Sequence, residues 1–214
     1  MLSYSIGGPE GRLSDSARHL PLRRYLIAAI TTLGRPDAIF DTSVDPARFQ
    51  WMRDYHRFDL NQKGRIQTKK HRPVVPVSSV LDAWLEATDG MLVCKPVYVT
   101  DENSVPRVEQ SPVDSIRSAW DSMRVRMDIP PGWGPKLIRH SVATILAAQG
   151  VNLQEIEILL GHRVIKKTTA RYVVLQPDYL SSFQRVIEYL TEELTQICGQ
   201  SLHPTLTQKV EDDS

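Results

Sequence analysis

Apolar side chains recur at steps of three and four residues along most of this chain, which is the spacing of one helix face. The first such stretch covers 14–34 and ends at Gly34, a residue type that often terminates helices. Pro36 suits the first turn of a short second helix that runs to about Asp41. Later stretches predict a helix that begins at 76–79 and stops near Gly90, and others over 111–127, 136–149, 153–160 and 179–197.

Apolar and polar residues alternate instead between Trp51 and Val77. With Lys63-Gly64 as a turn, this segment predicts two or three antiparallel strands. The predicted fold class is therefore α+β, mostly helical, with a small antiparallel β-hairpin or sheet. Polar stretches without either period predict a flexible N-terminus at 1–13, an exposed loop at 100–112 and a flexible acidic tail at 198–214, so the expected domain covers 14–197.

Composition limits the possible classes of protein. Apolar residues make up 41% of the 214 residues, which is enough for a packed core. No apolar run approaches the roughly 20 residues of a membrane span, and the N-terminus lacks a signal-peptide pattern, so we expect a soluble, cytoplasmic protein without membrane contact. The formal net charge of +1 indicates nothing about nucleic acid, because phosphate binding depends on local clusters of lysine and arginine.

The stretch 136–172 carries the side chains with the clearest chemistry. Arg139 begins an apolar helix, His162 follows the turn residue Gly161, and Tyr172 comes a few residues later. A guanidinium binds phosphate oxygens through two parallel hydrogen bonds, and a tyrosine oxygen is a nucleophile that attacks phosphorus. The groups needed to attack a phosphodiester without a metal ion are therefore present. Taken singly, each has a structural alternative, such as a helix cap for the histidine and core packing for the tyrosine.

The order of these motifs resembles the tyrosine recombinase (phage integrase) family. Lys136-Leu137-Ile138-Arg139-His140 is similar to the His-x-x-Arg-His signature of its catalytic domain, and Leu160-Gly161-His162 and Thr168-Thr169-Ala170-Arg171-Tyr172 follow it. Upstream, Thr32-Leu33-Gly34-Arg35-Pro36 resembles the first arginine box of the family. Thr68-Lys69-Lys70-His71-Arg72 resembles the strand-turn-strand segment that carries its catalytic lysine.

The resemblance implies how a DNA strand would be cleaved. Arg35 and Arg139 would stabilise the charge on the phosphate, and His162 would donate a hydrogen bond to it. Tyr172 would form a 3′-phosphotyrosyl link, which conserves the bond energy and needs no ATP, metal ion or other cofactor. Lys69 would protonate the departing 5′ oxygen. The implied activity is that of a site-specific recombinase or integrase.

Other positions qualify this assignment. Lys70 is the reserve for the catalytic lysine, and His140 matches a histidine that is usually structural. Lys136 stands where most members have a histidine, and it would act as a base only if neighbouring cations or burial lowered its pKa. The path from His162 to Tyr172 is slightly longer than the common spacing. The resemblance covers 20–197 and lacks the separate N-terminal core-binding domain of most members.

A basic cluster at 53–72 predicts contacts with the DNA backbone, although alone it would indicate only a solvated hairpin. The predicted DNA-binding residues, with two lysines from the segment before the nucleophile, are Arg57, Lys63, Arg65, Lys70, Arg72, Lys166 and Lys167. The implied partner is double-stranded DNA. The apolar stripe of the last helix would either pack within the chain or dock on a neighbouring subunit, as in family members that form a tetramer on DNA.

Two other functions fit parts of the sequence. A metal-dependent nuclease would use Asp37, Asp41 and Asp45, whose spacing suits one helix face, although Ser43 and Pro46 indicate that the helix ends before Asp45. A non-catalytic or degenerate integrase-like DNA-binding protein from a mobile element would explain Lys136 and the shifted tyrosine. Covalent attachment of DNA to Tyr172 distinguishes the recombinase from both.

Overall fold

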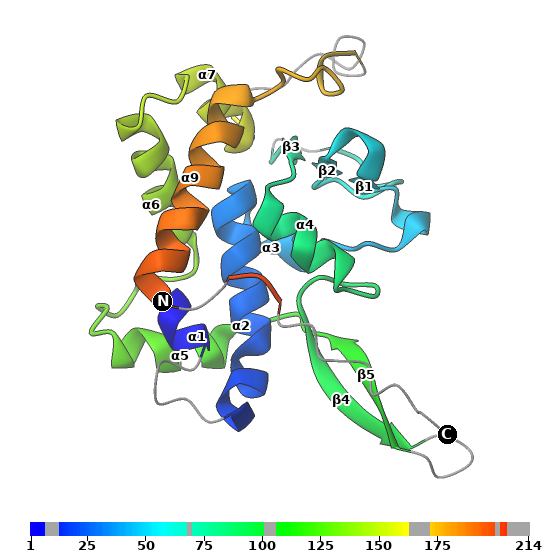
Figure 1. Cartoon of the computed structure of the whole chain (residues 1–214), viewed down its shortest axis with the longest axis vertical. Coiled ribbons are helices and arrows are strands. Elements are labelled where there is room, and N and C mark those ends of the chain that lie inside the picture. Colours follow the sequence, from blue (N-terminus) through cyan, green and yellow to red (C-terminus); the bar gives the residue numbers. More distant parts are fainter. Residues whose placement is uncertain (7–12, 68–69, 101–105, 163–171, 200–201, 205–214) are drawn as a thin grey trace.

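The computed structural model describes residues 1–6, 13–67, 70–100, 106–162, 172–199 and 202–204. The fold is α+β and mostly helical, as predicted, and helix α2 (Leu13–Thr32) runs through its centre (Figure 1). The residues from Leu22 to Leu33 are all buried. The reason is that α2 contacts five other helices, which are α1 (Leu2–Ile6), α3 (Pro36–Phe40), α4 (Ser79–Glu86), α5 (Arg117–Arg126) and α6 (Lys136–Ala148). No helix in the described ranges is long and apolar enough to cross a membrane.

The helices of the C-terminal half are close to their predicted bounds. They are α6, α7 (Leu153–Leu159) and α9 (Ser181–Cys198). Asn152 caps the start of α7, because its side-chain oxygen accepts a hydrogen bond from the Gln154 amide. Phe183 and Ile187 of α9 are buried where it packs on α4, α6 and α7. The apolar face of this last helix is therefore largely covered by its own chain.

The predicted antiparallel strands form a three-stranded sheet in the order β1 (Trp51–Met52), β2 (Arg57–Asp59) and β3 (Val74–Pro76). Phe58 lies opposite Val75, and both side chains are buried. Short 3-10 helices, η1 (Pro46–Arg48) and η2 (Arg53–Tyr55), precede and follow β1. The sheet lies beside α3 and α4, across α2 from the helices α6, α7 and α9 (Figure 1).

A second, two-stranded hairpin was not predicted. Strands β4 (Cys94–Thr100) and β5 (Pro106–Pro112) pair along their whole length and project from the body of the molecule (Figure 1). The prediction of an exposed loop at 100–112 is wrong for 106–112, and α5 begins at Arg117 rather than at 111. Much of the hairpin does not pack against the core, and Tyr98, for example, is 84% exposed. The alternation of apolar and polar residues that identifies a half-buried strand is therefore missing.

The segments predicted to be flexible tails are partly ordered. Residues Leu2–Ile6 form helix α1, which contacts α2 and buries Leu2. Near the other end Leu202 is fully buried, and its carbonyl oxygen accepts a hydrogen bond of 2.7 Å from the Trp84 indole. Polar composition around these positions hid single apolar anchors, since one buried leucine produces no periodic pattern.

Asp59 at the end of β2 leads to a prediction about pH and stability. Burial raises the pKa of this carboxyl to about 6, although the Asn61 amide, which donates to it at 2.8 Å, acts in the opposite direction. A raised pKa in the folded state means that stability is lost as the pH rises through about 6, because the buried group must then ionise. Asp59→Asn keeps the acceptor for Asn61 and removes this charge.

We therefore expect Asp59→Asn to be more stable than the parent protein by about 2 kcal/mol at pH 8, with little difference at pH 4. Urea unfolding at a series of pH values measures the effect. The exposed Asp54→Asn is the matched control and should show no comparable gain. A gain for Asp59→Asn that stays constant from pH 4 to pH 8 would contradict the assignment.

Candidate active site

Two arginines from distant parts of the sequence converge on one backbone oxygen. Arg35 precedes the first turn of α3, and Arg139 lies one turn into α6. Arg35 donates from Nη2 to the carbonyl oxygen of Leu160 at 3.3 Å, and Arg139 donates from Nη2 to the same oxygen at 2.5 Å. Arg35 also donates to the His71 carbonyl at 3.0 Å, and Arg139 to the Leu33 carbonyl. The two side chains predicted to bind phosphate are thus brought together.

The electrostatics of this pair favour an anion. Arg139 is only 8% exposed, and burial, followed by the neighbouring charge of Arg35, lowers its pKa to about 10. Asp37 opposes this shift. Arg139 therefore remains charged at neutral pH beside a second cation, in a place where water stabilises it poorly. A phosphate group supplies the negative charge and the acceptor oxygens that such a pair lacks.

The Leu-Gly-His turn lies against both arginines. Helix α7 ends at Leu159, and Gly161 follows with a φ of +60°, a conformation that side chains with a Cβ rarely adopt. The amide of His162 donates to the Glu157 carbonyl at 2.9 Å, and the residue is exposed. Lys136 is exposed at the start of α6, one helical turn before Arg139. Arg35 and Arg139 therefore share one backbone oxygen, while Lys136 and His162 lie near them in the chain, three residues before Arg139 and two residues after Leu160.

Gly161 is predicted to be irreplaceable at this junction. A Cβ added to it would lie 2.2 Å from the His71 carbonyl oxygen and 3.2 Å from Nη1 of Arg35. Gly161→Ala must therefore displace backbone and the first arginine, and we expect it to cost more than 3 kcal/mol of stability, about 1 kcal/mol of which is backbone strain. Gly150→Ala is the matched control, because Gly150 also has positive φ, +77°, with nothing within 4 Å of its added Cβ. Urea unfolding of both variants checks this, and equal losses would contradict the close approach seen here.

The two tyrosines of the C-terminal segment differ in environment. Tyr172 is 70% exposed, and its hydroxyl donates no hydrogen bond to another described residue, whereas Tyr179 is 6% exposed and donates to the Val74 carbonyl at 3.0 Å. This fits Tyr179 as a packing residue. Residues 163–171, which join His162 to Tyr172, lie outside the described ranges. No contact in the described part of the chain joins Tyr172 to Arg35 or Arg139.

Arg57 anchors the segment that follows Tyr172. Its guanidinium donates to the carbonyls of Val174 at 3.1 Å and Gln176 at 3.0 Å, and the residue is 4% exposed. Arg72 is 5% exposed and forms ion pairs with Asp37 and Asp41. The prediction that Arg57 and Arg72 contact DNA does not fit these positions, because both guanidinium groups are bonded inside the protein.

The other predicted basic contacts differ in what the structure says of them. Lys63 is exposed, and its ammonium lies 4.0 Å from the centre of the Phe49 ring. Lys70 is exposed and directly precedes His71, whose carbonyl accepts from Arg35. Arg65 is half-buried and donates to the Asn61 side chain at 2.8 Å. Lys69, Lys166 and Lys167 lie outside the described residues, so their predicted roles stay predictions.

The aspartates of the nuclease alternative have other partners. Asp37 and Asp41 bind Arg72, and Asp45 accepts a hydrogen bond from the Ala47 amide at 2.9 Å. In the described part of the chain, no three His, Cys, Asp or Glu side chains are grouped so that they could hold a metal ion.

Sequence comparison assigns the class of protein. The model of the phage integrase family matches residues 65–178, more than half of the chain, and the protein belongs to this family. No curated protein and no solved structure matches it. The matched segment contains Lys69, Lys136, Arg139, His162 and Tyr172. Arg35 precedes this segment, so its assignment depends on the geometry that pairs it with Arg139.

Proposed function

We propose that the protein is a site-specific DNA recombinase that cleaves and rejoins DNA through a 3′-phosphotyrosyl intermediate, and that 14–197 form its catalytic domain. The observation that carries this proposal is the convergence of Arg35 and Arg139 on the carbonyl of Leu160, two residues before His162. A phosphate placed against this pair accepts hydrogen bonds from two fixed guanidinium groups. Membership of the phage integrase family supports the same reaction class.

In the proposed reaction the Tyr172 oxygen attacks phosphorus and the bond from phosphorus to the 5′ oxygen breaks. The phenol proton must pass to a base as the new bond forms, because the oxygen bonded to phosphorus no longer carries it. Lys136, which is exposed at the start of α6, is the proposed acceptor of this proton, and Lys69 is the proposed donor to the departing 5′ oxygen. Rejoining is the reverse reaction with the 5′ hydroxyl of another strand, so no external energy source is required.

The arginine pair contributes most in the transition state. Negative charge on the two non-bridging oxygens rises as the tyrosine attacks, and donors that are already in place stabilise it without further rearrangement. His162 adds a hydrogen bond from the turn beside the pair. In the described part of the basic cluster, Lys63 and Lys70 are the exposed lysines. They are proposed to bind the DNA backbone.

The proposed self-association on DNA involves exposed side chains of the last helix, α9. The apolar face of α9 is buried against its own chain, but Tyr189 and Ile197 on this helix are 51% and 77% exposed. These side chains are proposed to contact a neighbouring subunit in a tetramer on DNA. Light scattering of the protein with and without bound duplex measures this assembly.

The proposal is tested by trapping the covalent intermediate. A pool of nicked duplexes with a randomised centre is first enriched for binding by gel shift, and the bound duplexes are then incubated with the protein. The nick releases a short fragment after cleavage, which prevents rejoining and traps the adduct. Denaturing electrophoresis and peptide mapping should show DNA attached to Tyr172, with and without EDTA.

The same experiment separates the alternatives. Binding without an adduct would favour a non-catalytic DNA-binding relative, and loss of cleavage on adding EDTA would favour a metal-dependent nuclease. An adduct on a residue other than Tyr172 would overturn the assignment of the nucleophile.

A further inference from the structure

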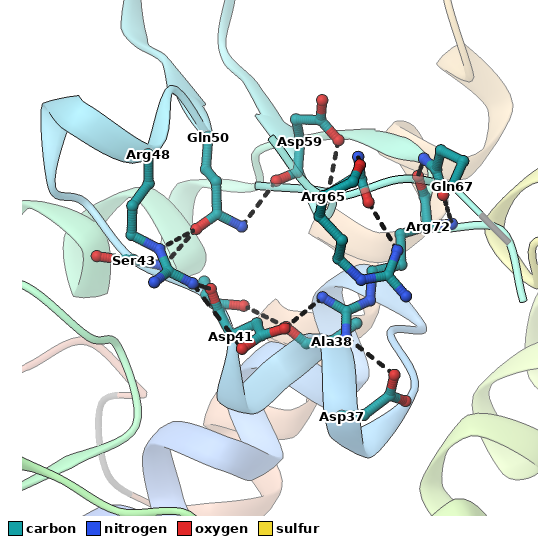
Figure 2. A network of polar contacts seen from close by, with 12 residues as sticks. Asp37, Ala38, Asp41, Ser43, Arg48, Gln50, Asp59, Arg65, Gln67 and Arg72 are labelled. Carbon is teal, nitrogen blue, oxygen red and sulfur yellow. Dashed lines mark hydrogen bonds and ion pairs between the residues drawn. The ribbon is translucent and has the colours of Figure 1, made fainter. Parts of the chain in front are cut away.

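Arg72 is the centre of a buried network behind the arginine pair. Figure 2 shows its guanidinium between the carboxylates of Asp37 and Asp41 on α3, with hydrogen bonds of 2.9 Å and 2.6 Å. The Arg72 side chain is 6% exposed, whereas that of Asp37 is 56% exposed. Arg48 approaches Asp41 at 3.9 Å from the other side, and within the described residues it forms no hydrogen bond or ion pair with Asp37. Two carboxylates one helical turn apart repel each other, so an arginine between them stabilises this arrangement.

Arg72 is also fixed through its backbone. Its amide donates to the Gln67 side chain at 3.1 Å, and its carbonyl accepts from the same side chain at 2.8 Å. These two hydrogen bonds join Gln67 to Arg72, on either side of the lysine-bearing stretch (Figure 2). The guanidinium therefore reaches α3 from a defined anchor, and a cation elsewhere on the surface is not an equivalent substitute.

The charge of Asp37 also interacts with the two arginines of the proposed phosphate site. It comes two residues after Arg35 in the sequence, and the charges of Asp37 and Arg139 act on each other. Burial alone would raise the pKa of Asp37, but the hydrogen bond and charge of Arg72, together with the charge of Arg35, lower it overall. The charge of Asp37 thus interacts with both arginines of the pair, while its hydrogen-bonded partner is Arg72.

We propose that Arg72 is a positioning residue that holds Asp37 away from Arg35 and Arg139 and so leaves this pair open to a DNA phosphate. The inference rests on the proposed function of the pair as the phosphate site. Without Arg72, Asp37 turns to the nearest remaining cations, Arg35 and Arg139, and neutralises charge that the phosphate requires.

A double-mutant cycle tests this role. Arg72→Gln is expected to lower both duplex affinity and the rate of adduct formation about tenfold or more, the effect of one nearby charge interaction of about 1.4 kcal/mol. Asp37→Asn alone should stay within about threefold of the parent protein. The double variant Arg72→Gln/Asp37→Asn should recover to the level of Asp37→Asn, because the competing carboxylate is gone.

Control variants separate positioning from general stability. Arg48→Gln perturbs Asp41 in the same network without touching Asp37, so it should lower the urea midpoint but leave duplex affinity unchanged. Arg72→Lys should recover part of the affinity, since an ammonium can neutralise Asp37 but cannot bridge two carboxylates. A double variant that binds as weakly as Arg72→Gln would overturn the inference and make Arg72 a purely structural residue.

The readouts distinguish failure of this inference from failure of the proposed function. If the parent protein forms no adduct, the recombinase proposal fails, and fluorescence anisotropy with labelled duplex still decides whether Asp37→Asn restores affinity to Arg72→Gln. If Arg72→Gln does not fold while the double variant folds and binds DNA, the inference is supported. If neither folds, it is overturned.

Discussion

Tyr172→Phe is expected to abolish the covalent protein–DNA adduct while leaving duplex affinity within about twofold. The substitution removes one oxygen atom, and without it the phosphodiester has no nucleophile on this residue, so the rate should fall by about a thousandfold or more. The fold should be unaffected because the side chain is 70% exposed and its hydroxyl donates no hydrogen bond to another described residue. Suicide duplexes and denaturing electrophoresis measure the adduct, and anisotropy measures binding.

Tyr179→Phe is the matched control for this experiment. Its hydroxyl is buried and donates to the Val74 carbonyl, so its removal should lower stability by about 1 kcal/mol and leave the adduct intact. Tyr172→Phe is thus expected to change the reaction but not the stability, and Tyr179→Phe to change the stability but not the reaction. Normal adduct formation by Tyr172→Phe, or loss of the adduct in a folded Tyr179→Phe, would show that the roles of these tyrosines are wrongly assigned.

Arg139→Ala should reduce the rate of strand cleavage by about a hundredfold to a thousandfold, as expected for removal of a donor to the transition-state charge. It should also lower stability by about 1 to 3 kcal/mol, because the carbonyls of Leu33 and Leu160 lose a buried donor. Single-turnover cleavage of the suicide duplex and urea unfolding measure the two effects separately.

Two further variants make the result for Arg139 specific. Arg139→Lys retains a positive charge but cannot form two parallel bonds, so it should recover less than a tenth of the lost rate. The exposed Arg126→Ala on α5 is a surface control and should cleave normally. Cleavage by Arg139→Lys at the parental rate would show that charge alone is required, which contradicts a bidentate phosphate contact.

The sequence predicted those elements that carry their own local signals. Helices α6 and α7 have an apolar face together with Gly150 and Asn152 at their ends, so both their existence and their bounds could be predicted. The β4–β5 hairpin could not, because exposure on both faces removes the alternation on which strand prediction depends. Leu2 and Leu202 pack through single contacts, which no periodic analysis detects.

Some features of the candidate site could likewise be predicted from the sequence, and others could not. Motif order predicted Arg35, Arg139 and His162 as site residues, and the fold brings the two arginines together on the carbonyl of Leu160, two residues before His162. The Leu160 carbonyl that joins the arginines was not predicted, since a backbone oxygen has no side-chain signature. Arg57 and Arg72 were placed on the DNA surface because a run of basic residues does not reveal which of them turn inward. Their partners, two carbonyls for Arg57 and two carboxylates for Arg72, come from segments distant in the sequence.

The shared Leu160 carbonyl also affects the thermodynamics of DNA binding. A free arginine side chain loses up to about 2 kcal/mol of conformational entropy when it is held in one rotamer. Here both guanidinium groups are already held by backbone oxygens, so this entropy is lost when the protein folds and not when DNA arrives. Part of the affinity for a phosphate is therefore stored in the folded chain, and the preorganisation of the two arginines depends on an intact turn at Gly161.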